Sequence, residues 1–245
     1  MTRTLCTILP AALSVWLSWA ATAAEPLRLV TGNSAPFATG RRDGFFDLVV
    51  AEMFGRIGVH AEVRTHVSSA RALVNAGRGE DDGLVARICG LEMQYPSLVI
   101  VPEKIFDNDF VAFTLGPTFP TPDWRSLESC HIAYIRGWQI FEADLTVHRQ
   151  VTRVSDAAQL FELVGRQRVD GGLCERWQAL WYARALPVRV LEPPLARAEM
   201  FGYLHRKHAA LAPRAAAALA AMKRDGSYAR IFNATLGRLE TPQPP

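Results

Sequence analysis

The sequence predicts an α/β protein with mostly parallel sheets, arranged as two lobes. Three observations lead to this expectation. Short apolar strands alternate with helical segments along most of the chain, which is typical of α/β folds. A stretch rich in proline, threonine and glycine, residues 116–123, interrupts this alternation near its middle. The same alternation then begins again, which indicates a second lobe.

The first 24 residues differ in composition from all that follows. Arg3 is the one charged residue before Glu25, and an apolar stretch runs from Ile8 to Ala20. Small residues at 21–24 suit a signal-peptidase site, so the segment predicts a cleaved secretory signal peptide. Cys6 precedes the apolar stretch and so is not positioned as a lipid-anchor cysteine. Because a membrane span needs about 20 apolar residues, and no later segment supplies them, we expect no direct membrane insertion.

The elements of the first lobe follow from apolar patterning and from glycine and serine positions. Asp47 lies near the start of one helix, where a carboxylate is favoured, and Gly58 ends it. Ser68 and Ser69 are candidate caps for the next helix, which Gly77 stops. We expect helices at 45–54 and 70–76, and strands at 27–30, 59–63, 84–86, 99–101 and 111–115.

The second lobe repeats the pattern. Ser155 and Asp156 start an amphipathic helix that runs through Val164. Near the C-terminus an alanine-rich helix is expected at 213–224, and its Pro213 suits a first helical turn. We expect strands at 131–135, 151–154 and 188–191, and residues 169–173 resemble residues 80–84 of the first lobe in their placement.

Composition argues against a nucleic-acid partner. The formal net charge is +3, and of the 27 basic residues only three are lysines. The arginines are scattered and interleaved with acidic residues, whereas a nucleic-acid binder usually shows a clustered basic stripe.

Metal, redox and nucleophile motifs are also missing from the sequence. After the N-terminal segment the cysteines are Cys89, Cys130 and Cys174, and none lies in a C-x-x-C pair. Whether any two of them form a disulfide stays open. His205 and His208 lack a third ligand nearby, and no Gly-x-Ser-x-Gly motif is present. We therefore predict no metal, no cofactor and no catalytic residue.

The order of several short motifs resembles the family-three solute-binding proteins, the periplasmic receptors known for serving amino-acid importers. In the first lobe the matching strings are Gly32–Phe37 and Gly44–Leu48. In the second lobe they are Arg136–Gly137 and Ser155–Ala157, and the chain closes with Asp225–Tyr228. The resemblance covers nearly all of the chain after residue 24.

This resemblance implies a Venus-flytrap fold of the type II periplasmic binding proteins, in which two α/β lobes close around a ligand. The lobes would be joined by two hinge strands, the first at 111–115 and the second after Leu191. Lobe 1 would comprise residues 25–112, lobe 2 residues 113–192, and residues 193–245 would return to lobe 1 with the C-terminal helix.

Candidate ligand-binding residues lie in loops after strands. Phe37 either packs against a ligand or belongs to the core. In the second lobe, Arg136, Gly137 and Trp138 occupy the family's strand-to-helix loop, where free backbone N–H groups bind anions. Trp138 offers a stacking face, although a core position is an equally ordinary role for tryptophan.

The usual amino-acid clamp of the family is absent. Where the family carries Thr-x-x-Arg, this sequence has Leu91 and Gln94 in place of the threonine and the arginine. Arg87 lies earlier, at the end of a strand, and either binds an anionic group or pairs with a nearby acid. Glu175 occupies the position where the family places the aspartate that holds the ligand's amine.

The sequence thus predicts an exported, monomeric periplasmic protein that captures a small polar or anionic solute, such as an amino acid or related organic acid. Its partner would be an inner-membrane ABC permease or a sensor protein. Two alternatives stay open. The first is a ligand-free accessory protein that kept the fold without the clamp. The second is a periplasmic dehydratase with Glu175 as its general acid.

Overall fold

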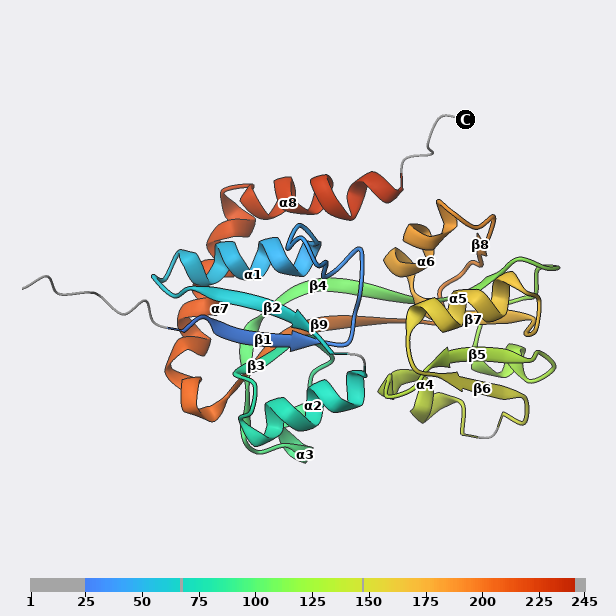
Figure 1. The fold of residues 1–245 in the computed structure, drawn as a ribbon, viewed down its shortest axis with the longest axis horizontal. Coiled ribbons are helices and arrows are strands. Elements are labelled where there is room, and N and C mark those ends of the chain that lie inside the picture. The colour runs from blue at the N-terminus through green and yellow to red at the C-terminus, as the bar shows by residue number, and fades with distance from the viewer. Residues whose placement is uncertain (1–24, 67, 147, 241–245) are drawn as a thin grey trace, which may run out of the picture.

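The computed structural model describes residues 25–66, 68–146 and 148–240. Its strands follow the order β2-β1-β3-β9-β4-β7-β5-β6, with β8 paired to β4. Two groups of elements, which we call lobe 1 and lobe 2, lie at opposite ends of two long strands (Figure 1). The predicted signal peptide, residues 1–24, lies outside the described residues. Among the residues described, no helix combines the length and apolar character that crossing a membrane requires.

Lobe 1 is built on three parallel strands, with β1 between β2 and β3. Helix α2 begins at Ser68, whose hydroxyl accepts a hydrogen bond from the Arg71 N–H at 3.4 Å. It ends at Gly79, whose φ of 76° is the left-handed conformation that glycine adopts easily. The elements are β1 (Leu27–Thr31), α1 (Phe45–Gly55), β2 (Ala61–Thr65), α2 (Ser69–Arg78), β3 (Gly83–Arg87) and α3 (Leu91–Gln94).

Two long antiparallel strands, β4 (Leu98–Thr114) and β9 (Ala196–His205), connect the lobes, and we call them the hinge ribbon (Figure 1). Pro102 lacks a backbone N–H, and the pairing of β4 with β9 shifts register in its neighbourhood, between Ile100 and Lys104. The single strand β4 replaces the two separate strands expected at 99–101 and 111–115. The first crossing is therefore much longer than its sequence pattern indicated.

Lobe 2 repeats the parallel arrangement, with β5 between β6 and β7. Strand β7 pairs antiparallel with β4, which joins the lobe to the hinge ribbon. Asp156 caps α5 by accepting from the Gln159 N–H at 3.0 Å, as its sequence position predicted. The elements are η1 (Trp124–Leu127), β5 (Ile132–Ile135), α4 (Gln139–Asp144), β6 (Val151–Val154), α5 (Ala157–Gly165), β7 (Gly171–Glu175), α6 (Arg176–Ala183) and β8 (Arg189–Val190).

The C-terminal helices follow strand β9 and pack against elements of lobe 1. Helix α8 lies alongside α1, on the side of the lobe 1 sheet opposite α2 (Figure 1). The segments are η2 (Arg206–Leu211), α7 (Ala212–Arg224), α8 (Ser227–Thr235) and η3 (Gly237–Leu239).

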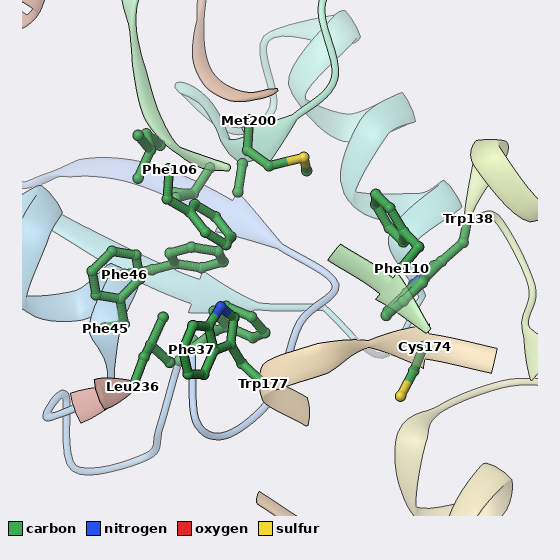
Figure 2. Packing of buried hydrophobic residues seen from close by; sticks show 14 of the residues in the cluster. Phe37, Phe45, Phe46, Phe106, Phe110, Trp138, Cys174, Trp177, Met200 and Leu236 are labelled. Carbon is green, nitrogen blue, oxygen red and sulfur yellow. The ribbon is translucent and has the colours of Figure 1, made fainter. Parts of the chain in front are cut away.

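Aromatic residues form the centre of the lobe 1 core. Phe37, Phe45, Phe46 and Phe106 gather in one group (Figure 2), and the rings of Phe37 and Phe46 stack with centroids 4.7 Å apart. Beside this group, the Trp177 ring of α6 packs edge-on against Phe232 of α8, with ring centroids 5.4 Å apart (Figure 2). Lobe 2 therefore contacts lobe 1 through its core side chains as well as through the ribbon.

Candidate functional site

A pocket lined by residues of both lobes and of the hinge ribbon lies between the two lobes, with a volume of about 50 Å³. Strand ends and helix starts from both lobes meet there, as is usual for ligand sites on open α/β sheets. Its lining residues are Asn33, Ser69, Leu73, Ala86, Arg87, Ile88, Leu91, Phe110, Gly137, Trp138, Gln139, Ile140, Glu175 and Met200.

Glu175 joins the two lobes from the end of β7. It is 4% exposed, and its Oε2 accepts a hydrogen bond of 2.6 Å from the Asn33 side-chain amide, which follows β1 in lobe 1. Burial raises the pKa of Glu175 to about 7, while Asn33, the charge of Arg87 and the nearby Asn108 amide act to lower it. The carboxyl group therefore titrates near neutral pH.

Arg87 supplies the positive charge of the cavity. Its Nη2 donates to the backbone carbonyl of Ser69 at 3.2 Å. Its Nε is fully enclosed and has no hydrogen-bond partner. Burial lowers the pKa of Arg87 to about 10, and the charge of Glu175 opposes this effect, so the guanidinium stays protonated at neutral pH.

The hinge ribbon adds a polar group beneath the cavity. Side chains alternate along β4, so Asn108 shares a face with Phe106 and with Phe110, a lining residue. Asn108 is 0% exposed, and neither atom of its amide has a hydrogen-bond partner of normal geometry. The same amide helps to lower the pKa of Glu175, so it lies next to that carboxyl group.

The lobes also touch where the loop before α4 meets the start of α2. Gly137 has φ of 85°, and a Cβ atom placed on it would lie 3.0 Å from the backbone nitrogen of Ala70. Trp138 follows, 6% exposed, with its ring stacked on Phe141 and edge-on to Phe110 (Figure 2). Any side chain larger than hydrogen at position 137 would hold the lobes apart.

The structure brings together four of the six residues predicted from the sequence. Arg87, Gly137, Trp138 and Glu175 all line the cavity. Phe37 does not: it is 0% exposed inside the lobe 1 core, which corresponds to its alternative interpretation as a core residue.

Arg136 is the second predicted residue outside the lining. It directly follows β5, and its side chain is exposed. The two residues that stand at the family's threonine and arginine positions also differ from each other in location. Leu91 lines the cavity, whereas Gln94, at the arginine position, is exposed and takes no part in it.

Asn33, Ser69, Asn108 and Met200 were missed by sequence reasoning. Asn33 lies in the 32–37 loop that the sequence did single out, so its position after a strand was a usable signal. Ser69 looked like part of a helix cap. Asn108 and Met200 lie in hinge strands whose length the sequence did not reveal, and no local pattern marks them.

The groups outside the cavity have structural roles. His208 Nε2 lies 2.8 Å from Asp82 Oδ1, and the described residues contain no cluster of three histidine, cysteine or acidic side chains fit to hold a metal. Cys89, Cys130 and Cys174 are all free thiols. Burial raises the pKa of Cys174 well above its usual value, which makes it unreactive as a thiolate.

Comparisons with solved structures agree with this fold. No family model matches the sequence, and no curated protein matches it. The GluR0 ligand-binding core in complex with L-glutamate is 15% identical, with a TM-score of 0.76, covering 88% of this chain and 100% of that chain. A mutant of ArgBP from T. maritima is 14% identical, with a TM-score of 0.74, covering 86% and 95%. A histidine kinase sensor domain with similarity to periplasmic binding proteins is 15% identical, with a TM-score of 0.75, covering 87% and 96%. The chain therefore has the two-lobed fold of periplasmic binding proteins.

Proposed function

We propose that this protein is a periplasmic solute-binding protein, which captures a small polar or anionic solute between its lobes for an ABC importer or a sensor. The observation that carries the proposal is the pocket between the lobes, whose lining holds Arg87 from lobe 1 and Glu175 from lobe 2, close enough for their charges to interact. Buried charged groups that line a cavity need a partner, and a solute of matching charge supplies one.

The proteins of similar solved structure are described as binding proteins, which supports this function. They include a complex with L-glutamate, arginine-binding proteins and a substrate-binding protein of an amino-acid ABC transporter. The sensor domain of a histidine kinase supports a sensor as the alternative partner. These names describe binding proteins rather than enzymes, so we propose no catalytic role for Glu175.

Export to the periplasm, cleavage of residues 1–24, and action as a monomer belong to the same proposal. Lobe 1 would comprise residues 25–112 and 193–245, and lobe 2 residues 113–192. Closure of the two lobes on a solute would then present a single closed surface to the permease or sensor.

The test is a melting-temperature screen of the exported protein against amino acids, small organic acids and cations. A solute at a hundred times its dissociation constant stabilises the folded protein by about 2.7 kcal/mol, which raises the melting temperature measurably. We expect a selective rise that Arg87→Ala removes. Arg78→Ala, at the exposed end of α2, is the matched control and should keep the rise.

An accessory protein that binds no solute is the second candidate. The observation in its favour is the Asn33–Glu175 hydrogen bond, which links the lobes through the chain's own side chains. If no solute shifts the melting temperature and a protein partner co-purifies stably, the accessory role replaces the solute-binding role.

A further inference from the structure

We infer that a proton-operated contact, which we call the latch, holds the two lobes together, with Glu175 of lobe 2 closing against Asn33 and Arg87 of lobe 1. The latch acts on the spacing of the lobes whether or not a solute lies between them, so it goes beyond the proposed solute-binding function. It follows from where the groups around Glu175 lie, from what buries its carboxyl group, and from its position at the start of a helix.

The groups that act on the Glu175 carboxyl group belong to lobe 1 and to the hinge ribbon. Glu175 ends β7 in lobe 2, and its Oε2 accepts the 2.6 Å hydrogen bond from the side-chain amide of Asn33. The charge of Arg87, at the end of β3 in lobe 1, acts on the same carboxyl group, and the Asn108 amide of β4 lies beside it. If the lobes moved apart about the ribbon, Glu175 would lose Asn33 and Arg87 together.

Contact between the lobes also removes this end of α6 from water. Gln178, three residues after Glu175, donates from its side-chain nitrogen to the Ser34 hydroxyl oxygen at 3.4 Å. Glu175 and Gln178 are 4% and 1% exposed. Because Asn33 and Ser34 cover them from lobe 1, separation of the lobes would return the carboxyl group to water. An ionised carboxylate is far better solvated in water than in a buried contact.

The position of Glu175 on its helix favours ionisation once the lobes separate. Glu175 is the N-cap residue of α6, where the helix dipole favours a negative charge. In water its pKa would lie near the ordinary value of 4.5, whereas burial between the lobes raises it to about 7, although Asn33, Arg87 and Asn108 act to lower it. Contact between the lobes therefore favours the protonated carboxyl group, and separation favours the ionised one.

Closing the lobes should consequently take up a proton. Below pH 4.5 Glu175 is protonated in both arrangements, and the contact is at its most favourable. As pH rises from 4.5 to 7, the ratio of closed to open protein should fall by about tenfold per pH unit, or up to about 300-fold in all. Above pH 7 Glu175 is ionised in both arrangements, and the ratio stays constant.

The charged and titratable neighbours of Glu175 keep their charge between pH 5 and pH 8. Arg87 on β3 stays charged, because its pKa of about 10 lies above this range. The Cys174 thiol on β7 stays protonated, since burial raises its pKa well above the usual value. Arg176, the next residue on α6, also stays charged, because its hydrogen bonds to Glu192 and Asp109 raise its pKa.

Histidine is the other side chain that commonly titrates in this range. All six histidines lie in the described part of the chain, and none lines the pocket between the lobes. Four of them form hydrogen bonds within their own lobe: His66, His131, His148 and His208. A pH-dependent spacing of the lobes would therefore originate at Glu175.

Small-angle X-ray scattering of residues 25–245 without solute, from pH 5 to pH 8, measures the spacing of the lobes as a radius of gyration. We expect this radius to increase as pH rises, because the ionised carboxyl group disfavours the contact. Glu175→Gln keeps an acceptor for the Asn33 amide and has no proton to lose, so it should stay compact throughout. Glu162→Gln, which removes an exposed carboxyl group of the same lobe, is the matched control and should follow the parent protein.

A ¹³C NMR titration of the glutamate carboxyl groups in the parent protein provides the second measurement. We expect one signal that titrates near pH 7 and is missing from Glu175→Gln. A Glu175 signal that titrates below pH 5 would overturn the inference, as would a radius of gyration that stays constant, decreases with rising pH, or increases equally in Glu175→Gln. Neither measurement contains a solute, so both results are independent of whether the melting-temperature screen finds one.

Discussion

At the scale of single residues, the account rests on two buried charges that face each other across a cleft. Arg87 was identifiable from the sequence because a charged side chain directly after a buried strand must face a cleft or find a partner. Glu175 was identifiable through the resemblance alone. Its hydrogen bond with Asn33 was not predictable, since the two residues are 142 positions apart and meet only when both lobes are in place.

Glu175 makes the stability of the protein depend on pH. Its pKa rises from 4.5 to about 7 on folding, so the folded state holds this proton more tightly than the unfolded state. Its contribution is therefore complete below pH 4.5 and is lost as pH rises through 7, by up to about 3 kcal/mol at 1.36 kcal/mol per pKa unit.

Glu175→Gln removes this titration. We expect the variant to be more stable than the parent protein at pH 8 and of similar stability at pH 4.5, as measured by urea unfolding at both values. Glu162→Gln, an exposed carboxyl group in the same lobe, is the control and should change little at either pH. A Glu175→Gln variant with equal destabilisation at both pH values would show that the carboxyl group acts through packing alone.

At the scale of elements, the spacing of apolar residues predicted the positions of several strands and helices. It located β1, β6, α1, α5 and α7 closely, because their apolar spacing and capping residues agree. It stopped α2 two residues early, at Gly77, whereas the left-handed backbone that ends the helix occurs at Gly79.

Hydrogen-bonded pairing between strands that are distant in the sequence defines the elements that the apolar pattern did not predict. Strand β4 was read as two pieces because Pro102 and the charged residues after it resemble a break. Pairing with β9 over 98–110 nevertheless holds it together as one strand. The sequence alone did not indicate that Asn108 lies in this strand, so Asn108 was not predicted as a residue of the candidate site.

The loop before α4 and the start of α2 form a close contact between the lobes. We expect Gly137→Ala to weaken solute affinity by about tenfold, because the new Cβ meets Ala70 across the lobes. The positive φ at this position adds about 1–2 kcal/mol of strain, which lowers the stability of the protein with or without solute. The measurement is calorimetric affinity together with the melting temperature of the free protein.

Gly165→Ala is the matched control for this variant. It lies in the same lobe, at the end of α5, and its added Cβ would meet nothing nearer than 3.9 Å. If both variants lower affinity equally, closure at Gly137 has no special part in binding.

At the scale of the whole molecule, the two-lobed architecture was predictable because the alternation of strands and helices occurs twice. What could not be predicted is the small volume of the pocket between the lobes, since it depends on how closely Gly137 approaches Ala70 and on the Asn33–Glu175 bond. These contacts bring the lobes to a separation at which a small solute fills the remaining space.

The molecule also offers a competing place for a solute. A groove of about 420 Å³ lies against the hinge ribbon and α8, and Lys104, Tyr228 and Phe232 contribute to its walls. A ligand bound in this groove would stabilise the protein without lying between the charged residues of the two lobes.

The most direct test of the account is a crystal structure of residues 25–245 grown with the solute that raises their melting temperature most. The account predicts electron density for that solute in the cavity between the lobes, with its charged group against Arg87. Density in the hinge groove, or at any site that leaves the cavity between Arg87 and Glu175 without solute, would contradict it.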